Sequence, residues 1–218
     1  MQYCSNCVMP DTRPDLKLNE QGVCSACQSY ANRQAVDWSA RLLELEPILD
    51  KYRSKDHSRW DCIIPVSGGK DSTYQVLRML QLGMNPLCIT ATTGDLSDIG
   101  GKNIENIKNL GVDYVEFSAN PVVRRKMNRI GLLNVGDISW PEHCGIFTIP
   151  VRAAVQFGVP LIVWGENPQN EYGGPVANAS DNVLTPRWLE RFGGLLGITP
   201  IDLIWQEGIQ QRDSIPYL

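Results

Sequence analysis

The chain has 218 residues, 43% of them hydrophobic and 20% charged, which is the composition of an ordinary globular protein. Its formal net charge of -4 argues against a surface built to hold a nucleic-acid backbone, so we expect no nucleic-acid partner. No apolar run reaches the length of a membrane span, and the N-terminus lacks the basic start and apolar core of a signal peptide. We therefore expect a cytoplasmic protein without a membrane partner.

Residues 1–32 form the first expected unit, which is rich in Cys, Pro, Asp and Asn and poor in apolar periodicity. Such a segment buries too little surface to fold without a stabilising cross-link such as a bound metal ion. Cys4 and Cys7, then Cys24 and Cys27, form two C-x2-C pairs with sixteen residues between them. This spacing predicts a structural Zn²⁺ site with four thiolate ligands. An iron–sulfur cluster is the competing interpretation, because four thiolates also suit that centre.

Residues 33–58 are expected to form a linker helix, since Trp38, Leu42 and Leu45 recur at near-helical spacing and Asp37 can cap its start. Residues 59–218 then alternate between strand and helix patterns. Strands are expected at 62–66, 87–92, 114–117 and 161–164, and helices at 71–81, 103–110, 121–130, 146–157 and 186–196. This order predicts an α/β domain with an open parallel sheet and helices on both faces. Because proline removes a ladder donor, Pro65 is expected at the end of its strand.

Six residues between the first strand and the first helix of this domain carry the strongest chemical signal: Ser67, Gly68, Gly69, Lys70, Asp71 and Ser72. A strand that runs into a glycine-rich loop and a helix start gathers free backbone N–H groups and a positive helix end at one point. We therefore expect a phosphate-binding loop, in which Lys70 neutralises phosphate charge and Asp71 holds Mg²⁺. The spacing differs from that of the Walker loop and from G-x-G-x-x-G.

Several other residues can be interpreted in two ways. Cys144 precedes the helix expected at 146–157, where a thiolate can be stabilised, but burial in the core is the alternative. His143 fits a loop or cap position. The basic cluster of Arg124, Arg125, Lys126 and Arg129 fits a solvated helix face or a local anion-binding patch. A built-in glutaminase would need a nucleophilic Cys on a strand–helix elbow, and no cysteine lies in one, so any ammonia must come from another protein.

Residues 67–72 match the PP-loop motif of the ATP pyrophosphatases, the adenine nucleotide alpha hydrolase fold. The resemblance implies that ATP is split into AMP and pyrophosphate, that an oxygen of the substrate is adenylated, and that a nitrogen or sulfur nucleophile then displaces AMP. It also implies that adenine lies against the end of the second strand and near the end of the fourth. Those positions are Thr90, Ala91, Thr92 and Gly165.

The whole chain resembles the N-acetyl sugar amidotransferase family. The motifs that carry the resemblance are Cys4-Ser-Asn-Cys7-Val-Met-Pro-Asp-Thr-Arg13, Pro65-Val-Ser-Gly-Gly-Lys-Asp-Ser72, Asp98-Ile-Gly-Gly-Lys-Asn103, Glu142-His-Cys-Gly145, Trp164-Gly-Glu-Asn-Pro-Gln-Asn-Glu-Tyr-Gly-Gly174 and Trp188-Leu-Glu-Arg-Phe-Gly-Gly-Leu-Leu196. Members of this family convert an N-acetyl group of a bacterial surface sugar to an acetamidino group. The resemblance implies a separate glutaminase partner as the ammonia source and an N-acetylated sugar or nucleotide sugar as substrate.

The remaining candidate site residues follow from this resemblance. Glu166 and Glu171 are candidates for the group that deprotonates or orients ammonia. Candidates for substrate contacts are Asp98, Lys102, Asn103, Arg152, Asn167, Gln169, Asn170 and Tyr172. For Arg152 an exposed salt bridge is an equal alternative.

Two rival functions use the same features. A tRNA sulfurtransferase also combines a PP-loop with zinc knuckles, and Cys144 could deliver its sulfur. A zinc-ribbon binding module on an inactive nucleotide-binding scaffold is the rival from outside the enzymes, and the intact loop at 67–72 weighs against it.

Overall fold

A computed structural model describes residues 1–12, 16–33, 36–92, 96–165, 185–187, 190 and 195–218. The chain divides into two compact units, one that contains Met1–Ile48 and one that begins at Leu49. Each is considered by itself below.

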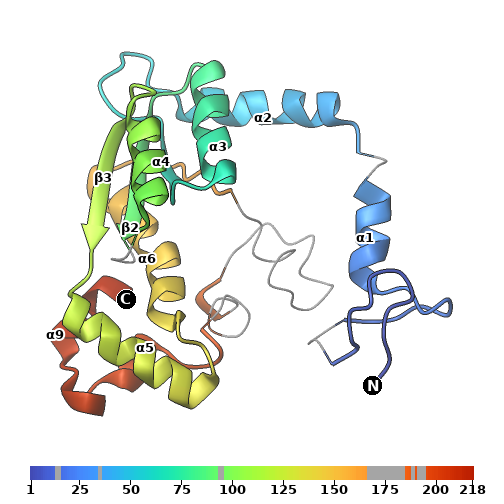
Figure 1. The fold of residues 1–218 in the computed structure, drawn as a ribbon. Helices are drawn as coiled ribbons and strands as arrows, with labels where there is room; N and C mark the ends of the chain where they lie inside the picture. The colour runs from blue at the N-terminus through green and yellow to red at the C-terminus, as the bar shows by residue number, and fades with distance from the viewer. Residues whose placement is uncertain (13–15, 34–35, 93–95, 166–184, 188–189, 191–194) are drawn as a thin grey trace. The chain divides into compact units, whose positions relative to one another are not determined.

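In the first unit, two short loops precede two helices (Figure 1). Isolated antiparallel bridges join Tyr3 to Pro10 and Leu18 to Cys24. Helix α1 spans Ser25–Arg33 and helix α2 spans Trp38–Tyr52, whose residues from Leu49 on belong to the second unit. The predicted cap of α2 is confirmed, because the Asp37 side chain accepts hydrogen bonds from the backbone N–H groups of Ser39 and Ala40 at 3.0 Å each.

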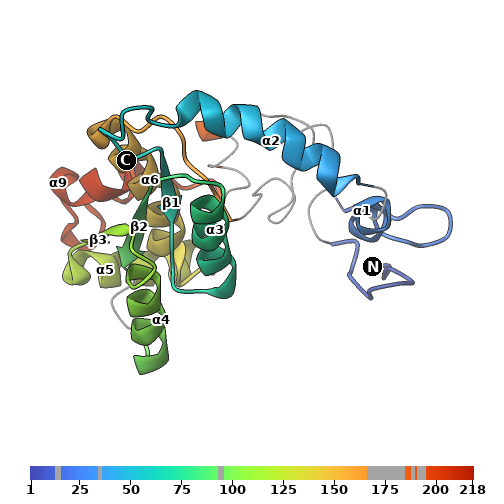
Figure 2. The ribbon, with the colours of Figure 1, turned by 90° about the horizontal axis from the view of Figure 1, so that it is seen from above.

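The second unit is built on a parallel sheet in the order β1-β2-β3, with β1 at Cys62–Pro65, β2 at Pro86–Thr92 and β3 at Asp113–Ser118. Helix α3, Lys70–Gln81, connects β1 to β2, and helix α4, Asp98–Lys108, connects β2 to β3. Because both crossovers run in the same direction across the sheet and such connections are right-handed, α3 and α4 share one face. Figures 1 and 2 show these two helices side by side.

The opposite face of the sheet is covered by helix α6, Trp140–Phe157. Ile63, Leu87 and Ile89 point to this face and share a buried core with Ile149 and Ala154 of the helix. The α/β fold with a parallel sheet and helices on both faces is thus confirmed.

The fourth predicted strand, 161–164, is reduced to a single parallel bridge between Ile63 and Ile162. Ile63 donates to the Leu161 carbonyl at 2.8 Å and accepts from the Val163 N–H at 2.9 Å. In a parallel ladder the next donor on this edge of β1 is two residues on, at Pro65, which has no N–H. The expectation that Pro65 ends its strand is correct, and the same residue explains why the fourth strand does not extend.

Two helices begin earlier than the sequence indicates. Helix α4 starts at Asp98 instead of 103, because the Ser97 hydroxyl accepts from the Gly100 N–H at 3.1 Å and caps it. Helix α6 starts at Trp140 instead of 146, with Pro141 in its first turn, where a missing N–H costs nothing. His143 and Cys144 therefore lie inside a helix, and their predicted loop position is wrong.

Helix α5 spans Pro121–Val135 and ends at Gly136, whose φ of 74° is the left-handed cap that favours glycine. The C-terminal segment forms short turns: η2 at Pro200–Leu203, η3 at Gln206–Gly208, α9 at Gln211–Ser214 and η4 at Ile215–Tyr217. They share a second core with α5 and α6 around the buried indole of Trp140. Most of the helix predicted at 186–196 lies outside the described residues. Within the described part of the chain, no helix has both the length and the apolar character that a membrane crossing requires.

Candidate functional site

The loop between β1 and α3 has the shape of an anion cradle. Gly68 has a φ of 78°, and a Cβ there would lie 3.3 Å from side-chain atoms of Asn103 and Ile104, so the loop packs closely on α4. Gly69 is the N-cap of α3 and has no side chain, and among the described residues no side chain forms a capping hydrogen bond with this helix end. The first N–H groups of α3 are thus left to an external acceptor, and the helix dipole favours a negative one.

Hydroxyl groups hold this loop in place from the inside. The Ser72 Oγ accepts from the Ser67 N–H at 3.4 Å and donates to the Gly69 carbonyl at 3.1 Å. The Thr73 hydroxyl donates to the same carbonyl at 2.9 Å. The backbone of the loop is therefore fixed before any ligand arrives, which lowers the entropic cost of binding.

A pocket of about 210 Å³ opens beside the loop. The loop contributes Ser67, Gly69, Asp71 and Ser72 to its lining, and β2, α6 and the segment after α6 contribute an apolar wall. The residues of that wall are Ile89, Ala91, Ile146, Pro150 and Trp164. Trp164 is held against α6 by a tilted ring contact with Phe147, with 5.5 Å between the ring centroids. An apolar slot next to an anion cradle at the carboxyl edge of a parallel sheet is an arrangement that suits a nucleotide.

Gln75 belongs to this pocket and is absent from the sequence-based candidates. Its Oε1 is buried and has no hydrogen-bond partner among the described residues. A Cβ at Gly165 would lie 2.9 Å from this oxygen, so glycine leaves the space that the carboxamide needs. A buried acceptor without a partner is costly, which suggests that a ligand donates to it. Gln75 lies one helical turn after Ser72. This spacing is the sequence signal that could have identified Gln75 as a pocket residue.

Lys70 and Asp71 both lie at the start of α3 and are highly exposed. Their side chains form an ion pair at 2.7 Å, with exposed fractions of 88% and 71%. Asp71 lines the nucleotide-sized pocket, whereas Lys70 lines an open depression on the other side of the loop together with Asn103. Both charges are therefore free to reorganise around a bound phosphate or a cation.

Of the other positions predicted to bind ATP, some line the pocket and others do not. Ala91 and Gly165 line the pocket. Thr90 is buried, donates to the Val66 carbonyl and accepts from the Tyr114 hydroxyl, so it anchors the residue that precedes the loop. Thr92 donates to Glu116 at 2.8 Å and lines a small neighbouring cavity with Ala91 and Glu142.

The predicted substrate contacts are similarly dispersed. Asp98 and Lys102 are exposed on α4, and Asn103 lies against the loop at Gly68. Arg152 on α6 donates to the carbonyls of Ile215 and Leu218 at 3.0 and 3.1 Å, which fastens the C-terminal turn. The predictions for Glu166, Asn167, Gln169, Asn170, Glu171 and Tyr172 fall outside the described residues.

In the first unit, the four cysteines of the two C-x2-C pairs converge. The Sγ atoms of Cys4, Cys7, Cys24 and Cys27 all lie within 4.8 Å of one another, with 4.0 Å between Cys4 and Cys27 and 3.6 Å between Cys7 and Cys24. Four sulfur atoms around one Zn²⁺ at about 2.3 Å lie roughly 3.8 Å apart, so the cluster fits a single ion. In an iron–sulfur cluster the iron atoms lie between the four thiolates. The sulfur atoms of those thiolates are therefore farther apart than they are around one Zn²⁺.

Backbone geometry prepares these sulfur atoms for a cation. The N–H groups of Asn6 and Cys24 donate to the Cys4 Sγ at 3.4 and 3.2 Å. Burial acts to raise the pKa of Cys4, but backbone hydrogen bonds, that from Cys24 the largest, outweigh it and lower the pKa to about 6. For Cys27, a hydrogen bond with Asn6 acts to lower the pKa, yet the neighbouring thiols and burial together raise it to about 12. A cation bound among the four sulfur atoms would favour the thiolate form of each cysteine.

The remaining cysteines are core residues. Burial raises the pKa of Cys62 and of Cys88 to about 12. Burial also raises the pKa of Cys144, with Asp137 and Glu142 adding to the effect. Cys144 is 3% exposed, so its thiol is neutral and shielded at neutral pH.

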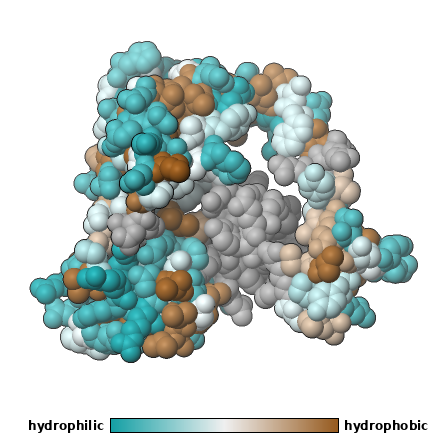
Figure 3. Space-filling view, viewed as in Figure 1, coloured by the Kyte–Doolittle hydropathy of each residue, from teal (hydrophilic) through white to brown (hydrophobic). Residues whose placement is uncertain are grey.

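The basic cluster lies on α5. Arg124 pairs with Glu142, Arg129 pairs with Glu207, and the Lys126 ammonium donates to the Glu207 carbonyl at 2.8 Å. Figure 3 shows a largely hydrophilic surface over α5 with separate apolar spots. With three of its four cations already paired, this helix fits the solvated-face interpretation.

No protein-family model matches the chain, and no curated protein matches it. Among solved structures, the chain is similar to an NMN synthetase from Francisella tularensis, with a TM-score of 0.44, 15% sequence identity, and coverage of 81% of this chain and 80% of that chain. It is also similar to a predicted subunit of tRNA methyltransferase from Methanocaldococcus jannaschii, with a TM-score of 0.35, 17% identity, and coverage of 63% and 64%. Neither likeness assigns a substrate or an activity to this chain.

Proposed function

We propose that this protein is an ATP-dependent amidotransferase that splits ATP into AMP and pyrophosphate. The observation that carries the proposal is the uncapped start of α3, which opens through the Ser67–Ser72 loop onto the pocket lined by Asp71 and Gln75. The N–H groups of the loop would hold the terminal phosphates, and the apolar wall would receive the base. Asp71 would hold Mg²⁺, which neutralises phosphate charge when it is bound.

The chemistry needs two steps. An amide oxygen of the substrate attacks the α-phosphorus of ATP, and the bond to the bridging oxygen breaks to release pyrophosphate. Ammonia then attacks the activated amide carbon, one proton is lost, and the carbon–oxygen bond breaks to release AMP and leave an amidine. The preorganised loop stabilises the charge that develops on the departing pyrophosphate.

For the substrate and partner, the proposal is an N-acetylated sugar of a bacterial surface glycan and a separate glutaminase. It rests on the motif resemblance. No cysteine of the described residues has the exposed, base-paired arrangement of a built-in glutaminase, since Cys62, Cys88 and Cys144 are buried and the remaining four form the metal cluster. In this proposal a Zn²⁺ held by the four thiolates stabilises the first unit and leaves no open coordination position for catalysis.

The test is an incubation of the zinc-loaded protein with ATP, Mg²⁺, a high ammonium concentration and a panel of N-acetylated nucleotide sugars and nonulosonic acids. Mass spectrometry should detect replacement of the acetamide oxygen by an NH group, together with AMP and pyrophosphate. Lys70→Ala and Asp71→Ala should abolish pyrophosphate release without changing the unfolding temperature, because both side chains are exposed. Full turnover in both variants would refute the assignment of the loop.

Base thiolation in tRNA remains the second candidate, since it shares the adenylation step. It would need a sulfur donor other than Cys144 in its buried state. A gel shift with bulk tRNA at physiological salt separates the two candidates, because phosphate-driven binding would appear there. Tight tRNA binding without amidine formation would favour thiolation.

A further inference from the structure

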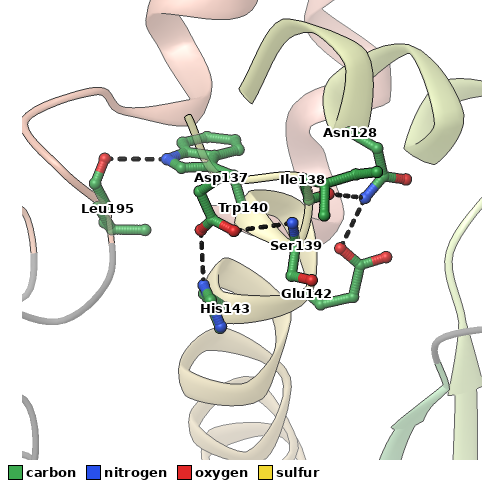
Figure 4. A network of polar contacts seen from close by, with 8 residues as sticks. All are labelled: Asn128, Asp137, Ile138, Ser139, Trp140, Glu142, His143 and Leu195. Carbon is green, nitrogen blue, oxygen red and sulfur yellow. Dashed lines mark hydrogen bonds and ion pairs between the residues drawn. The ribbon is translucent and has the colours of Figure 1, made fainter. Parts of the chain in front are cut away.

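A histidine–aspartate pair lies at the start of α6. The His143 Nδ1 is 2.8 Å from the Asp137 Oδ2, and the Ser139 N–H donates to the other carboxylate oxygen at 2.8 Å. Because a carboxylate only accepts, the neutral form of the imidazole beside it carries its proton on Nδ1 and its lone pair on Nε2. Figure 4 shows Nε2 turned away from Asp137, and it makes no hydrogen bond to any described residue.

The corner that holds this pair is rigid. The Trp140 indole N–H donates to the Leu195 carbonyl at 2.9 Å, and its ring is 1% exposed (Figure 4). The Asn128 side chain donates to the Ile138 carbonyl and to Glu142. His143 is therefore aimed by its surroundings, and its side chain is still 36% exposed.

The position of His143 on α6 connects it to the nucleotide pocket. Ile146 and Pro150 line that pocket, and His143 precedes Ile146 by three residues, which is one turn and about 4.5 Å along the helix axis. A Cβ at Gly145 would lie 3.9 Å from the Ala91 side chain, which places this turn at the carboxyl end of β2. His143 thus lies one helical turn before the part of α6 that lines the pocket, at the spacing that places it on the same helix face as Ile146 and Pro150.

We propose that His143 is the base that accepts the proton of the nitrogen nucleophile, with Asp137 as its positioning residue. This inference rests on the proposed function. When ammonia adds to the adenylated carbon, its nitrogen becomes a cation. Nε2 takes one of its protons, the nitrogen lone pair that is freed then expels AMP, and an amidinium ion and a histidinium ion remain. Asp137 stabilises the imidazolium by an ion pair at Nδ1.

The other titratable groups near this turn are occupied or shielded. Glu142 faces α5, where it contacts Arg124 and Asn128. Cys144 and Tyr217 are buried. Among the described residues of this corner, His143 alone has a ring nitrogen that is not engaged in a hydrogen bond.

The tautomer can be tested without any substrate, because the chain has only two histidines. Long-range ¹H–¹⁵N spectra of ¹⁵N-histidine protein should show one imidazole protonated on Nδ1 at high pH, and this signal should vanish in His143→Gln and change in Asp137→Asn. His57→Asn is the matched control, since asparagine tolerates the positive φ of 55° found there. A His143 signal with its proton on Nε2 would overturn the inference.

The kinetic test uses ATP, Mg²⁺, ammonium chloride and the sugar nucleotide that the wild-type protein amidinates. His143→Gln should slow amidine formation by about 10² to 10⁴-fold and keep pyrophosphate exchange into ATP, and added imidazole should partly restore His143→Ala. His57→Asn should match the wild type. A wild type that forms no amidine refutes the proposed function, whereas undiminished amidine formation by His143→Gln refutes only the role of His143.

Discussion

Gln75 carries a buried carboxamide oxygen that has no hydrogen-bond partner among the described residues and lies at the pocket beside the Ser67–Ser72 loop. An unpaired buried acceptor costs about 1–3 kcal/mol, and a ligand that donates to it recovers part of this cost. We therefore expect Gln75→Leu to raise the unfolding temperature of the free protein and to weaken ATP binding about 3- to 10-fold in titration calorimetry.

The same substitution at Gln81, which is exposed on the same helix and pairs with Arg78, is the matched control. Gln81→Leu should leave ATP affinity unchanged. If Gln75→Leu lowered stability and kept the affinity, the carboxamide would have a structural role instead.

Residue-level prediction from the sequence succeeded where a motif fixes local geometry. Gly68 has the positive φ that favours glycine, Gly69 is the N-cap of α3, and the four cysteines meet at ion-sized separations. Gln75 and the Asp137–His143 pair were not predicted from the sequence, because their roles depend on which helix face turns toward the pocket and on where α6 begins. No local sequence pattern indicates which helix face turns toward the pocket or where α6 begins.

At the scale of elements, the α5–α6 corner depends on a close approach at Gly131. A Cβ there would lie 2.6 Å from the Asp137 carbonyl oxygen and 2.7 Å from the Trp140 Cβ. We expect Gly131→Ala to lower the free energy of unfolding by about 1–3 kcal/mol, because neither the backbone nor the buried indole can move aside. Urea denaturation followed by circular dichroism measures this change.

Gly101 in α4 provides the opposite case, since a Cβ there meets nothing within 4 Å. Gly101→Ala should raise the free energy of unfolding by up to about 1 kcal/mol through helix propensity. Equal effects of the two substitutions would contradict the packing described at the corner.

The metal module should depend on its ligands and on pH. Cys24→Ser should lose bound Zn²⁺ and the structure described for residues 1–12 and 16–33, whereas Ser25→Ala, next to it but not a ligand, should keep both. Metal analysis and thermal denaturation measure these effects. Full metal content in Cys24→Ser would refute the four-thiolate site.

The sign of the pH effect follows from Cys4, whose pKa in the folded chain is lowered from 9.0 to about 6. A lowered pKa means that the folded module favours the thiolate, so the associated stability is present above pH 9 and is lost as the pH falls toward 6. Zn²⁺ release, followed with a chromogenic chelator, should therefore increase with acidification. An increase in Zn²⁺ release toward alkaline pH would contradict this sign of the pH effect.

For the molecule as a whole, the order of strands and helices was predictable because strand and helix periods alternate clearly from residue 62 to 157. The extent of the sheet was not, because it depends on the missing N–H of Pro65, whose effect appears only once Leu161–Val163 lies beside β1. The helix starts at Asp98 and Trp140 were missed because capping and core packing outweighed the weak local signals.

The central claim is that the loop after β1 directs attack at the α-phosphorus of ATP. The most direct measurement is chromatography of the nucleotide products after incubation of the zinc-loaded protein with α-labelled ATP, Mg²⁺, ammonium and an N-acetylated sugar nucleotide that it amidinates. We expect AMP and pyrophosphate in equal amounts with the amidine. ADP and orthophosphate as the products would contradict it.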